Sequence, residues 1–311
     1  MGNNPQSYLT KIGFGKETSW GTNAARTIFV PITEPRFNPK AYKHIIDQGM
    51  RGVGAEEFDI IPGVGQADGQ FGGSMYLDPF GLLLTAILGA DTYATGTHTI
   101  AQDPNPPSLT LEWTTDIDTY LIGGYRQSAL TINFNGNDGS LTYQSQGIGK
   151  IGATGTATAS PTYPTSVPIA GWMGSLTVGG AAANVLIEGS LTISRKLRPL
   201  HGLKSAAGGT QDLVSLYPGP ISMSGRLIFE MASFAEYNYY AAASTNAVVL
   251  TFQKDGTHNM AITMSKLAWR LGELEIADSA YQIVAQVNAL YNVTDAGIAK
   301  VAMKNDQASG Y

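Results

Sequence analysis

The chain has 311 residues, of which 14% are charged and 43% are hydrophobic, and its formal net charge is −5. A chain of this length can bury a substantial core, which excludes a small scaffold that depends on disulfides or metals. The negative charge excludes the basic surface that tight nucleic-acid binding requires, and the absence of cysteine excludes disulfides, thiolate nucleophiles and cysteine-bound metals.

Glycine and proline are abundant, with 37 and 15 residues, which suits many short strands joined by turns. We therefore expect a mainly β fold. The polar N-terminus, "MGNNPQSYLT", lacks the basic and apolar regions of a secretory signal. The longest apolar stretch, residues 80–90, has about half of the roughly 20 residues that a membrane-spanning helix needs. These features predict a soluble chain that is not secreted and does not bind a membrane.

The segment "GFGKETSWGTNAARTIFVP", residues 13–31, has two closely spaced glycines followed by a lysine, as a phosphate-binding loop does. A P-loop requires G-x-x-x-x-G-K-[ST], however, and a dinucleotide site requires a third glycine in G-x-G-x-x-G. Here Gly15 is followed by "KET", so both patterns fail. We expect a turn that leads into an extended arm, followed by a long loop over about residues 36–52.

Two segments predict short helices. In "LDPFGLLLTAILGA", residues 77–90, Asp78 can cap the start and Gly89 can cap the end of an apolar run. In "MASFAEYNYYAAAS", residues 231–244, Ser233 and Glu236 have the spacing of a capping box.

Apolar and polar residues alternate in many segments from Leu109 onward, which is the pattern of half-buried strands. "NGNDG" and "KDG" supply hairpin turns between such strands. In "VLIEGSLTIS", the alternation places Val185, Ile187, Leu191 and Ile193 on one side. The predicted strands lie in SLTLEWT, ALTINF, SLTYQSQ, VLIEGSLTIS, ISMSGRLIFEM, VVLTF, NMAITM and YQIVAQVNALY.

The order strand, helix, strand, hairpin occurs twice, once around each predicted helix. Between the two copies lies "GATGTATASPTYPTSVPIAGW", whose composition is that of a linker or an exposed loop. We interpret this as a structural duplication. Residues 1–151 would form an N-terminal arm, the long loop and a first half, residues 152–171 a linker, and residues 172–311 a second half.

No group of residues indicates catalysis or a bound metal. The four histidines, His44, His98, His201 and His258, lack metal-ligand spacing, and we interpret them as surface residues. The acidic clusters "EEFD" and "DID" lack the EF-hand pattern, and no G-x-S-x-G motif is present. We therefore expect no enzyme activity, no cofactor and no metal, and a protein whose product is its own assembly.

The opening segment also carries a more specific pattern, "IGFGKETSWGTNAARTIFVPITEPRFNPK", in which a short arm, a glycine-lysine-glutamate turn and an apolar strand follow one another. This resembles the N-terminal signature of bacteriophage tail tube proteins, the major tail proteins of long-tailed phages. Later segments follow in a similar order, namely "GMRGVG", "EEFDI", "FGLLLTAILG" and "GRLIFEMASFAEYNYYAA" with "VVLTF". The residues that carry the match in the opening segment are Gly13, Gly15, Lys16, Glu17, Gly21 and Thr22.

The resemblance implies a duplicated tail-tube-type β-sandwich or barrel with a short α-helix in each half. Such proteins are structural components of the virion that self-assemble into stacked rings, which form the conduit for DNA ejection into the host. The implied partners are further copies of this chain, the tape measure, tail terminator and distal tail proteins, and DNA in transient, non-specific passage. The chain would be made in the host bacterial cytoplasm and reside in the phage tail.

Two physical features suit this function. Joining the sheets of neighbouring subunits removes exposed strand edges. A slightly negative chain also lets DNA slide, because it does not neutralise the phosphates. The resemblance further implies that the loop over residues 36–52 contacts the next ring. The candidate assembly contacts are Lys16, Glu17, Trp20, Arg36, Lys40, Tyr42 and Arg51.

The duplication leaves two ring compositions open. If both halves adopt the tube fold, three chains build a ring with pseudo-sixfold symmetry, and we favour this composition. If only one half does, six chains are needed and the other half is an outer decoration. Two other function classes remain as alternatives, a β-rich decoration or receptor-binding component of the virion and a β-sandwich glycan hydrolase that uses acids such as Glu56 or Asp118.

Overall fold

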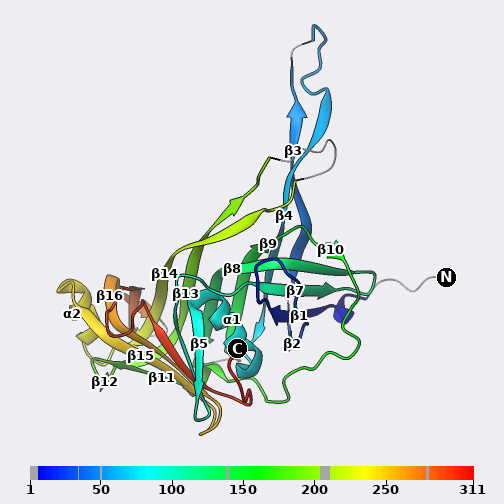
Figure 1. Ribbon diagram of the computed structural model, residues 1–311. Coiled ribbons are helices and arrows are strands. Elements are labelled where there is room, and N and C mark those ends of the chain that lie inside the picture. The colour runs from blue at the N-terminus through cyan, green and yellow to red at the C-terminus, as the bar shows by residue number, and fades with distance from the viewer. Residues whose placement is uncertain are drawn as a thin grey trace.

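The computed structural model describes residues 6–33, 35–49, 51–137, 139, 141–203, 211–277 and 280–311. Strands account for 57% and helices for 9% of the structure. The prediction of a mainly β fold with a short helix in each half is therefore confirmed. Figure 1 shows twisted sheets that form the body of the molecule and a long hairpin that projects from it.

The chain forms two series of strands, each with one α-helix. Up to residue 154 the elements are η1 (Ser7–Leu9), β1 (Lys11–Lys16), β2 (Ile28–Val30), β3 (Arg36–Asp47), β4 (Asp59–Ser74), α1 (Leu77–Leu88), β5 (Gly89–Ala94), β6 (Thr97–Gln102), β7 (Leu109–Thr114), β8 (Thr119–Asn135), β9 (Thr142–Gly149) and β10 (Ala153–Thr154). From residue 171 they are η2 (Gly171–Met173), β11 (Gly174–Val178), β12 (Ala181–Ala182), β13 (Val185–Leu200), β14 (Ser215–Glu230), α2 (Ala235–Ala241), β15 (Thr245–Gln253), β16 (Asn259–Ala277), β17 (Ala280–Ala289) and β18 (Lys300–Lys304).

The strand pairing of the first series is repeated in the second. The first series has the hydrogen-bonded order β3–β4–β9–β8–β7–β1. The second series has the order β13–β14–β17–β16–β15–β11, and all of these pairs are antiparallel in both series. In each series the α-helix follows the second strand of this order, β4 or β14. One arrangement of strands and helix therefore occurs twice in the chain.

β8 and β16 also share an irregularity. The register of β8 against β9 shifts between Gln127 and Ala129, and that of β16 against β17 shifts between Trp269 and Leu271. One extra residue at such a point forms a β-bulge, which bends the strand. Aligning the two bulges makes residues 129–135 of β8 equivalent to residues 271–277 of β16.

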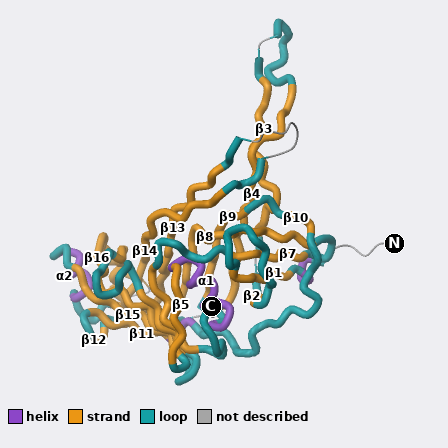
Figure 2. The backbone as a smooth tube through the Cα atoms, in the orientation of Figure 1, coloured by secondary structure: helices purple, strands orange, loops and turns teal. Residues whose placement is uncertain are grey.

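The two series join through hydrogen-bonded strands. Beyond its bulge, β8 leaves β7 and pairs with β13, with Ala129 opposite Ser194 and Asn135 opposite Glu188. β6 and β18 form a second link between the series. Figure 2 shows β8 and β13 side by side in the middle of the molecule, so one sheet continues from the first series into the second.

A buried arginine reinforces this junction. Arg195 lies on β13, and its guanidinium donates hydrogen bonds of 2.9 Å to the carbonyls of Ile87, Leu88 and Asp103. Ile87 and Leu88 are the last residues of α1, whose final carbonyls lack partners within the helix. Burial, with the positive charge of Arg126 nearby, lowers the pKa of Arg195 from its usual value. An arginine of the second series thus supplies hydrogen-bond donors to the C-terminal carbonyls of α1, the helix of the first series.

The sheet that runs from β9 and β8 through β13 to β14 and β17 is called the shared sheet. It has one apolar and one polar face, because successive side chains of a strand point to opposite sides. The apolar face packs under α1 and α2 and includes Leu130, Ile132, Phe134, Leu191, Ile193, Met223, Leu227 and Phe229. The polar face carries amide and hydroxyl side chains that lie opposite one another in consecutive strands, such as Gln144, Thr131, Thr192, Ser224 and Asn288.

The start of α1 differs from the prediction. Its N-cap is Tyr76, and no side chain caps its first turn. Asp78 instead accepts hydrogen bonds from the hydroxyl of Ser166 and the main-chain N–H of Asp306, so long-range partners take the place of a local cap. The prediction that Gly89 is the C-cap is confirmed, and its φ of 135° is one that glycine accommodates.

The capping box predicted at the second helix is wrong. The N-cap of α2 is Phe234, which makes no side-chain cap bond. The carboxylate of Glu236 accepts hydrogen bonds from the main-chain N–H and the side-chain amide of Asn184. Glu236 therefore attaches α2 to the residue that precedes β13.

Three further predictions are corrected. Val185 is 64% exposed, because a bulge between Leu186 and Glu188 reverses the alternation at the start of β13. Residues 36–47 are not a loop but strand β3, which pairs with β4. His98 is not a surface residue. It is fully buried in β6, with Nδ1 2.9 Å from a carboxylate oxygen of Asp91 and Nε2 bonded to a main-chain carbonyl.

Candidate assembly surfaces

The opening segment forms β1 and a tight turn, and glycine is required in both. A Cβ on Gly15 would lie 2.1 Å from the carbonyl oxygen of Ala25, and Gly21 has a φ of 76°. Only a residue without a side chain allows the returning chain to approach β1 so closely. Gly15, one of the two glycines that suggested a nucleotide loop, therefore serves backbone packing.

Glu17 is buried beside this turn, with 6% of its surface exposed. Its carboxylate accepts four hydrogen bonds, from the hydroxyls of Ser108 at 2.6 Å and Thr110 at 3.0 Å and from the main-chain N–H groups of Gly21 and Gly124 at 2.8 Å. These donors come from the turn after β1, from the start of β7 and from β8. The carboxylate thus joins three segments of its own subunit.

Lys16 and Trp20 flank Glu17 nearer the surface. The ammonium of Lys16, an exposed side chain, donates to the main-chain carbonyl of Tyr311. The indole N–H of Trp20 donates to the carbonyl of Gly124 at 3.1 Å, and the ammonium of Lys150 lies 5.6 Å from the centre of an indole ring. Both predicted contact residues are therefore held in place by partners within the chain.

The hairpin of β3 and β4 projects from the body, and we call its outer part, residues 41–66, the arm (Figure 1). At its tip, the guanidinium of Arg51 forms an ion pair with Asp47 and lies 4.6 Å from the centre of the Phe58 ring. Arg51 thus contacts one residue on each strand side of the hairpin, Asp47 and Phe58. Four predicted contact residues follow one another along this hairpin from base to tip, namely Arg36, Lys40, Tyr42 and Arg51.

The arm carries isoleucines on both of its faces. Ile45 lies opposite Ile61, and Ile46 lies opposite Ile60. Their exposed fractions range from 46% to 60%. Because adjacent residues of a strand point to opposite faces, each face has one isoleucine pair. A two-stranded hairpin is marginally stable alone, and exposed apolar pairs on it indicate an interaction surface.

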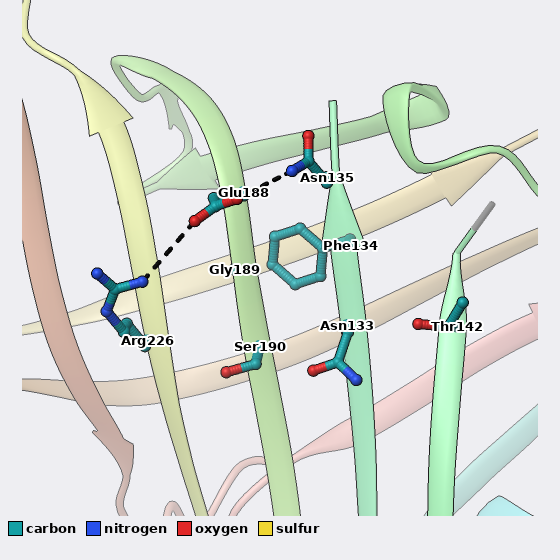
Figure 3. A pocket seen from close by; sticks show the side chains of 8 residues that line it. All are labelled: Asn133, Phe134, Asn135, Thr142, Glu188, Gly189, Ser190 and Arg226. Atoms are coloured by element: carbon teal, nitrogen blue, oxygen red, sulfur yellow. Dashed lines mark hydrogen bonds and ion pairs between the residues drawn. The ribbon is translucent and has the colours of Figure 1, made fainter. Parts of the chain in front are cut away.

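The polar face of the sheet contains a shallow hollow of about 380 Å³ over β8, β13 and β14 (Figure 3). Asn133 and Ser190 line its floor. Glu188 accepts a hydrogen bond of 2.9 Å from the amide of Asn135 and lies 3.8 Å from the guanidinium of Arg226. Since the two charges compensate each other, the hollow is polar but has no net charge.

The end of β16 is a strand edge. Residues 271–277 pair with β17 on one side, and no described strand pairs with them on the other. Leu274 and Ile276 are 47% and 72% exposed, whereas their equivalents in β8, Ile132 and Phe134, are 0% and 6% exposed because β13 lies beside them. β3 is another edge, since β4 is its one described partner strand. The sequence did not reveal these edges, because their alternation is that of any strand.

A second buried carboxylate attaches the extended segments to the body. Glu112 in β7 accepts hydrogen bonds from Nε of Arg26 at 2.7 Å and from the main-chain N–H and hydroxyl of Thr158. Burial by itself would raise the pKa of Glu112, but these hydrogen bonds outweigh it, and the pKa lies below the usual value of 4.5. Glu112 thus fixes the segment before β2 and the segment after β10 to one strand.

Among the described residues, no three histidine, aspartate or glutamate side chains gather as a metal ion would require. No described helix is long and apolar enough to cross a membrane. The features that stand out are therefore surfaces and edges, namely the arm, the polar face and the free ends of the shared sheet.

Comparison with known protein families matches residues 7–298 to the family described as phage tail tube protein. Comparison with curated proteins finds no match. The family match covers nearly the whole chain, from the opening segment through the arm and both helices to the last long hairpin. The chain therefore belongs to the phage tail tube family and is a structural virion protein that self-assembles into the tube of the phage tail.

Proposed function

We propose that three copies of this chain close into one ring of the tail tube. The supporting observation is the repeated strand order, β3–β4–β9–β8–β7–β1 followed by β13–β14–β17–β16–β15–β11. Each chain supplies two equivalent units, so three chains supply six positions of a pseudo-sixfold ring. A ring of six chains would leave one unit of each chain as an outer decoration, although that unit has the same strand order as the unit in the ring.

In this proposal, residues 1–151 and 172–311 are the two tube-like units, and residues 152–171 connect them. The connecting segment lies along the first unit. The N–H of Gly155 donates to the carbonyl of Thr119 at 2.9 Å, and the N–H of Leu141 donates to the carbonyl of Ile169 at 2.8 Å. A connector held at both ends would fix the spacing of the two units in the ring.

We infer that the polar face of the shared sheet lines the lumen. The helices cover the opposite face, so the bare face is the one that a closed ring can turn toward its axis. Hydroxyl and amide side chains do not neutralise phosphates, and tight binding of DNA requires that neutralisation. The compensated pair of Glu188 and Arg226 adds no net charge. DNA can therefore pass transiently and without sequence preference.

The arm, in this proposal, contacts the next ring of the tube. It projects from the body, and its isoleucine pairs lack a cover within the described chain. Glu17 contributes indirectly, because its carboxylate holds the turn that positions Trp20. The residues proposed to meet other subunits directly are Lys16, Trp20, Arg36, Lys40, Tyr42 and Arg51.

Replacing Ile46 and Ile60 together by threonine is expected to impair stacking but not ring formation. Threonine keeps the β-branched shape that suits a strand but removes apolar surface. We expect tubes at least about tenfold shorter than those of the wild type, as measured by negative-stain electron microscopy. Ile117→Thr is the matched control, since Ile117 is 77% exposed outside the arm. Variant tubes of wild-type length would contradict the role of the arm.

The chain has a non-enzymatic role in this proposal. As a subunit of the tube, it would surround the tape measure protein in the lumen and meet the tail terminator and distal tail proteins at the two ends. Synthesis in the host bacterial cytoplasm would precede assembly. An acidic groove for glycan hydrolysis has no supporting observation in the described residues.

Electron microscopy of purified protein at rising concentration tests the ring. End-on views, averaged without imposed symmetry, are expected to show a pseudo-sixfold outline with true threefold symmetry. Native mass spectrometry of the same rings is expected to give three chains. Six chains in a ring would overturn the proposed stoichiometry, and a monomer at every concentration, also in the presence of tail initiator proteins, would overturn ring formation.

A further inference from the structure

We propose that the end of β16 in one subunit pairs with β3 of the next subunit, and that this strand pair closes the ring. The inference rests on the proposed ring of duplicated chains. It comes from the junction inside the chain, where the first unit already joins the second through β8 and β13. If the units are equivalent, the second unit joins the first unit of the next copy in the same way.

The alignment of the units is given by the pairing registers. Residues 129–135 of β8 correspond to residues 271–277 of β16, because the two strands have the same bulge. Gln70 of β4 lies opposite Gln146, which pairs with Ala129, the first residue after the bulge of β8. Arg226 of β14 lies opposite Gln286, which pairs with Leu271, the first residue after the bulge of β16. Arg36 lies opposite Gln70, whereas Ser190 lies opposite Arg226. Residues 36–38 therefore correspond to residues 190–192.

This alignment predicts one specific register between subunits. In the junction within the chain, Ser190 lies opposite Asn133, Leu191 opposite Ile132, and Thr192 opposite Thr131. The equivalent pairs between subunits are Arg36 opposite Glu275, Phe37 opposite Leu274, and Asn38 opposite Glu273. The two strands would run antiparallel, as β8 and β13 do.

The side chains at these positions are complementary. Arg36, Glu273 and Glu275 are exposed, and none of them forms an ion pair within the described residues. Placing Arg36 opposite Glu275 joins opposite charges across the strands. Leu274 would meet Phe37, whose ring stacks on Phe71 of the core at a centroid distance of 6.1 Å.

The pairing also explains the exposed apolar end of β16. Leu274 and Ile276 stand where the first unit has Ile132 and Phe134, which are buried in the junction. A neighbouring β3 would cover them in the same way, and it would remove two free strand edges from every subunit. A second copy of this chain is therefore the occupant that fits this edge.

Charge reversal tests the register. Glu275→Arg and Arg36→Glu, each alone, place like charges opposite one another, and each is expected to raise the concentration needed for rings about tenfold or more. The double variant restores the attraction and is expected to form rings as the wild type does. Glu230→Arg is the matched control, an exposed glutamate on β14 that β17 separates from the free edge of β16. Single variants that assemble normally, or a double variant that stays unassembled, would overturn the strand pair.

Cysteine pairs give a second measurement in a chain that has no cysteine of its own. Asn38→Cys with Glu273→Cys is expected to form an intersubunit disulfide under mild oxidation, because directly opposite residues are close enough for the bond. Asn38→Cys with Glu275→Cys, two residues out of register, is expected to crosslink at least about tenfold less. Equal crosslinking of the two pairs would overturn the register. Rings of six chains that still crosslink at residues 38 and 273 would overturn the three-chain ring and support the strand pair.

Discussion

Replacing Glu17 by alanine is expected to lower the free energy of unfolding of the isolated subunit by about 3 to 5 kcal/mol. The Glu17 carboxylate is the shared acceptor of two hydroxyls and two main-chain N–H groups. A buried donor without a partner costs about 1 to 3 kcal/mol. Some of these donors would regain water near the turn, which keeps the total below the sum of four such penalties.

Thermal or urea unfolding of dilute, unassembled protein measures this effect of Glu17→Ala. For a chain of this size, a loss of this magnitude corresponds to a fall of about 5 to 8 °C in Tm. Glu17→Gln retains one oxygen acceptor and is expected to lose about half as much. Glu56→Ala is the control, because Glu56 is exposed on the arm and is expected to change stability by less than about 0.5 kcal/mol. Equal stabilities of Glu17→Ala and Glu56→Ala would refute the role of the Glu17 carboxylate in joining these segments.

Replacing Arg195 by methionine is expected to lower the free energy of unfolding by about 3 to 4 kcal/mol. Methionine fills much of the same space but leaves the carbonyls of Ile87 and Asp103 without the guanidinium donor, while the carbonyl of Leu88 keeps the main-chain N–H of Asp103. The last carbonyls of a helix carry partial negative charge, which the guanidinium also compensates. The loss would loosen α1 and the junction between the two units together.

Arg198→Met provides the matched control for Arg195→Met, since Arg198 is an exposed arginine on the same strand. Its replacement is expected to change stability by less than about 0.5 kcal/mol. Arg195→Lys should fall between the two, because a single ammonium cannot reproduce the fork of donors. Hydrogen exchange of the amides in α1 is expected to accelerate in Arg195→Met. Unchanged protection there, with unchanged stability, would contradict the role of Arg195.

The sequence predicted the class of protein through the opening segment, although not the roles of its residues. The pattern of Gly13, Gly15, Lys16, Glu17, Gly21 and Thr22 resembled the tail tube family, and the family match confirms it. Glu17 was predicted as an assembly contact, but its carboxylate is directed into the subunit. Its partners Ser108, Thr110 and Gly124 lie about 100 residues away in the chain. Local sequence carries no signal for such a long-range acceptor.

Predictions of helix starts were wrong for the same physical reason. Asp78 and Ser233 have the spacing of local caps, yet Asp78 binds Asp306 and Ser166, while Glu236 binds Asn184. Each local hydrogen bond is worth about 1 kcal/mol, and tertiary partners that become available on folding can outweigh it. Gly89 was predicted correctly, because a positive φ at a helix end is a requirement of the backbone itself.

The sequence by itself determined the features that depend on residues close together in the chain. These are the alternation that predicts strands, the turns, the helix end at Gly89 and the repeated order of elements. The sequence also indicated the family. Only the tertiary structure decided which strands pair, because pairing joins residues far apart in the chain and alternation is the same for a central strand and for an edge. It therefore showed that β8 is covered by β13 while its equivalent, the end of β16, is not. That difference in burial, between Ile132 and Leu274, identifies the edge that a second copy can cover.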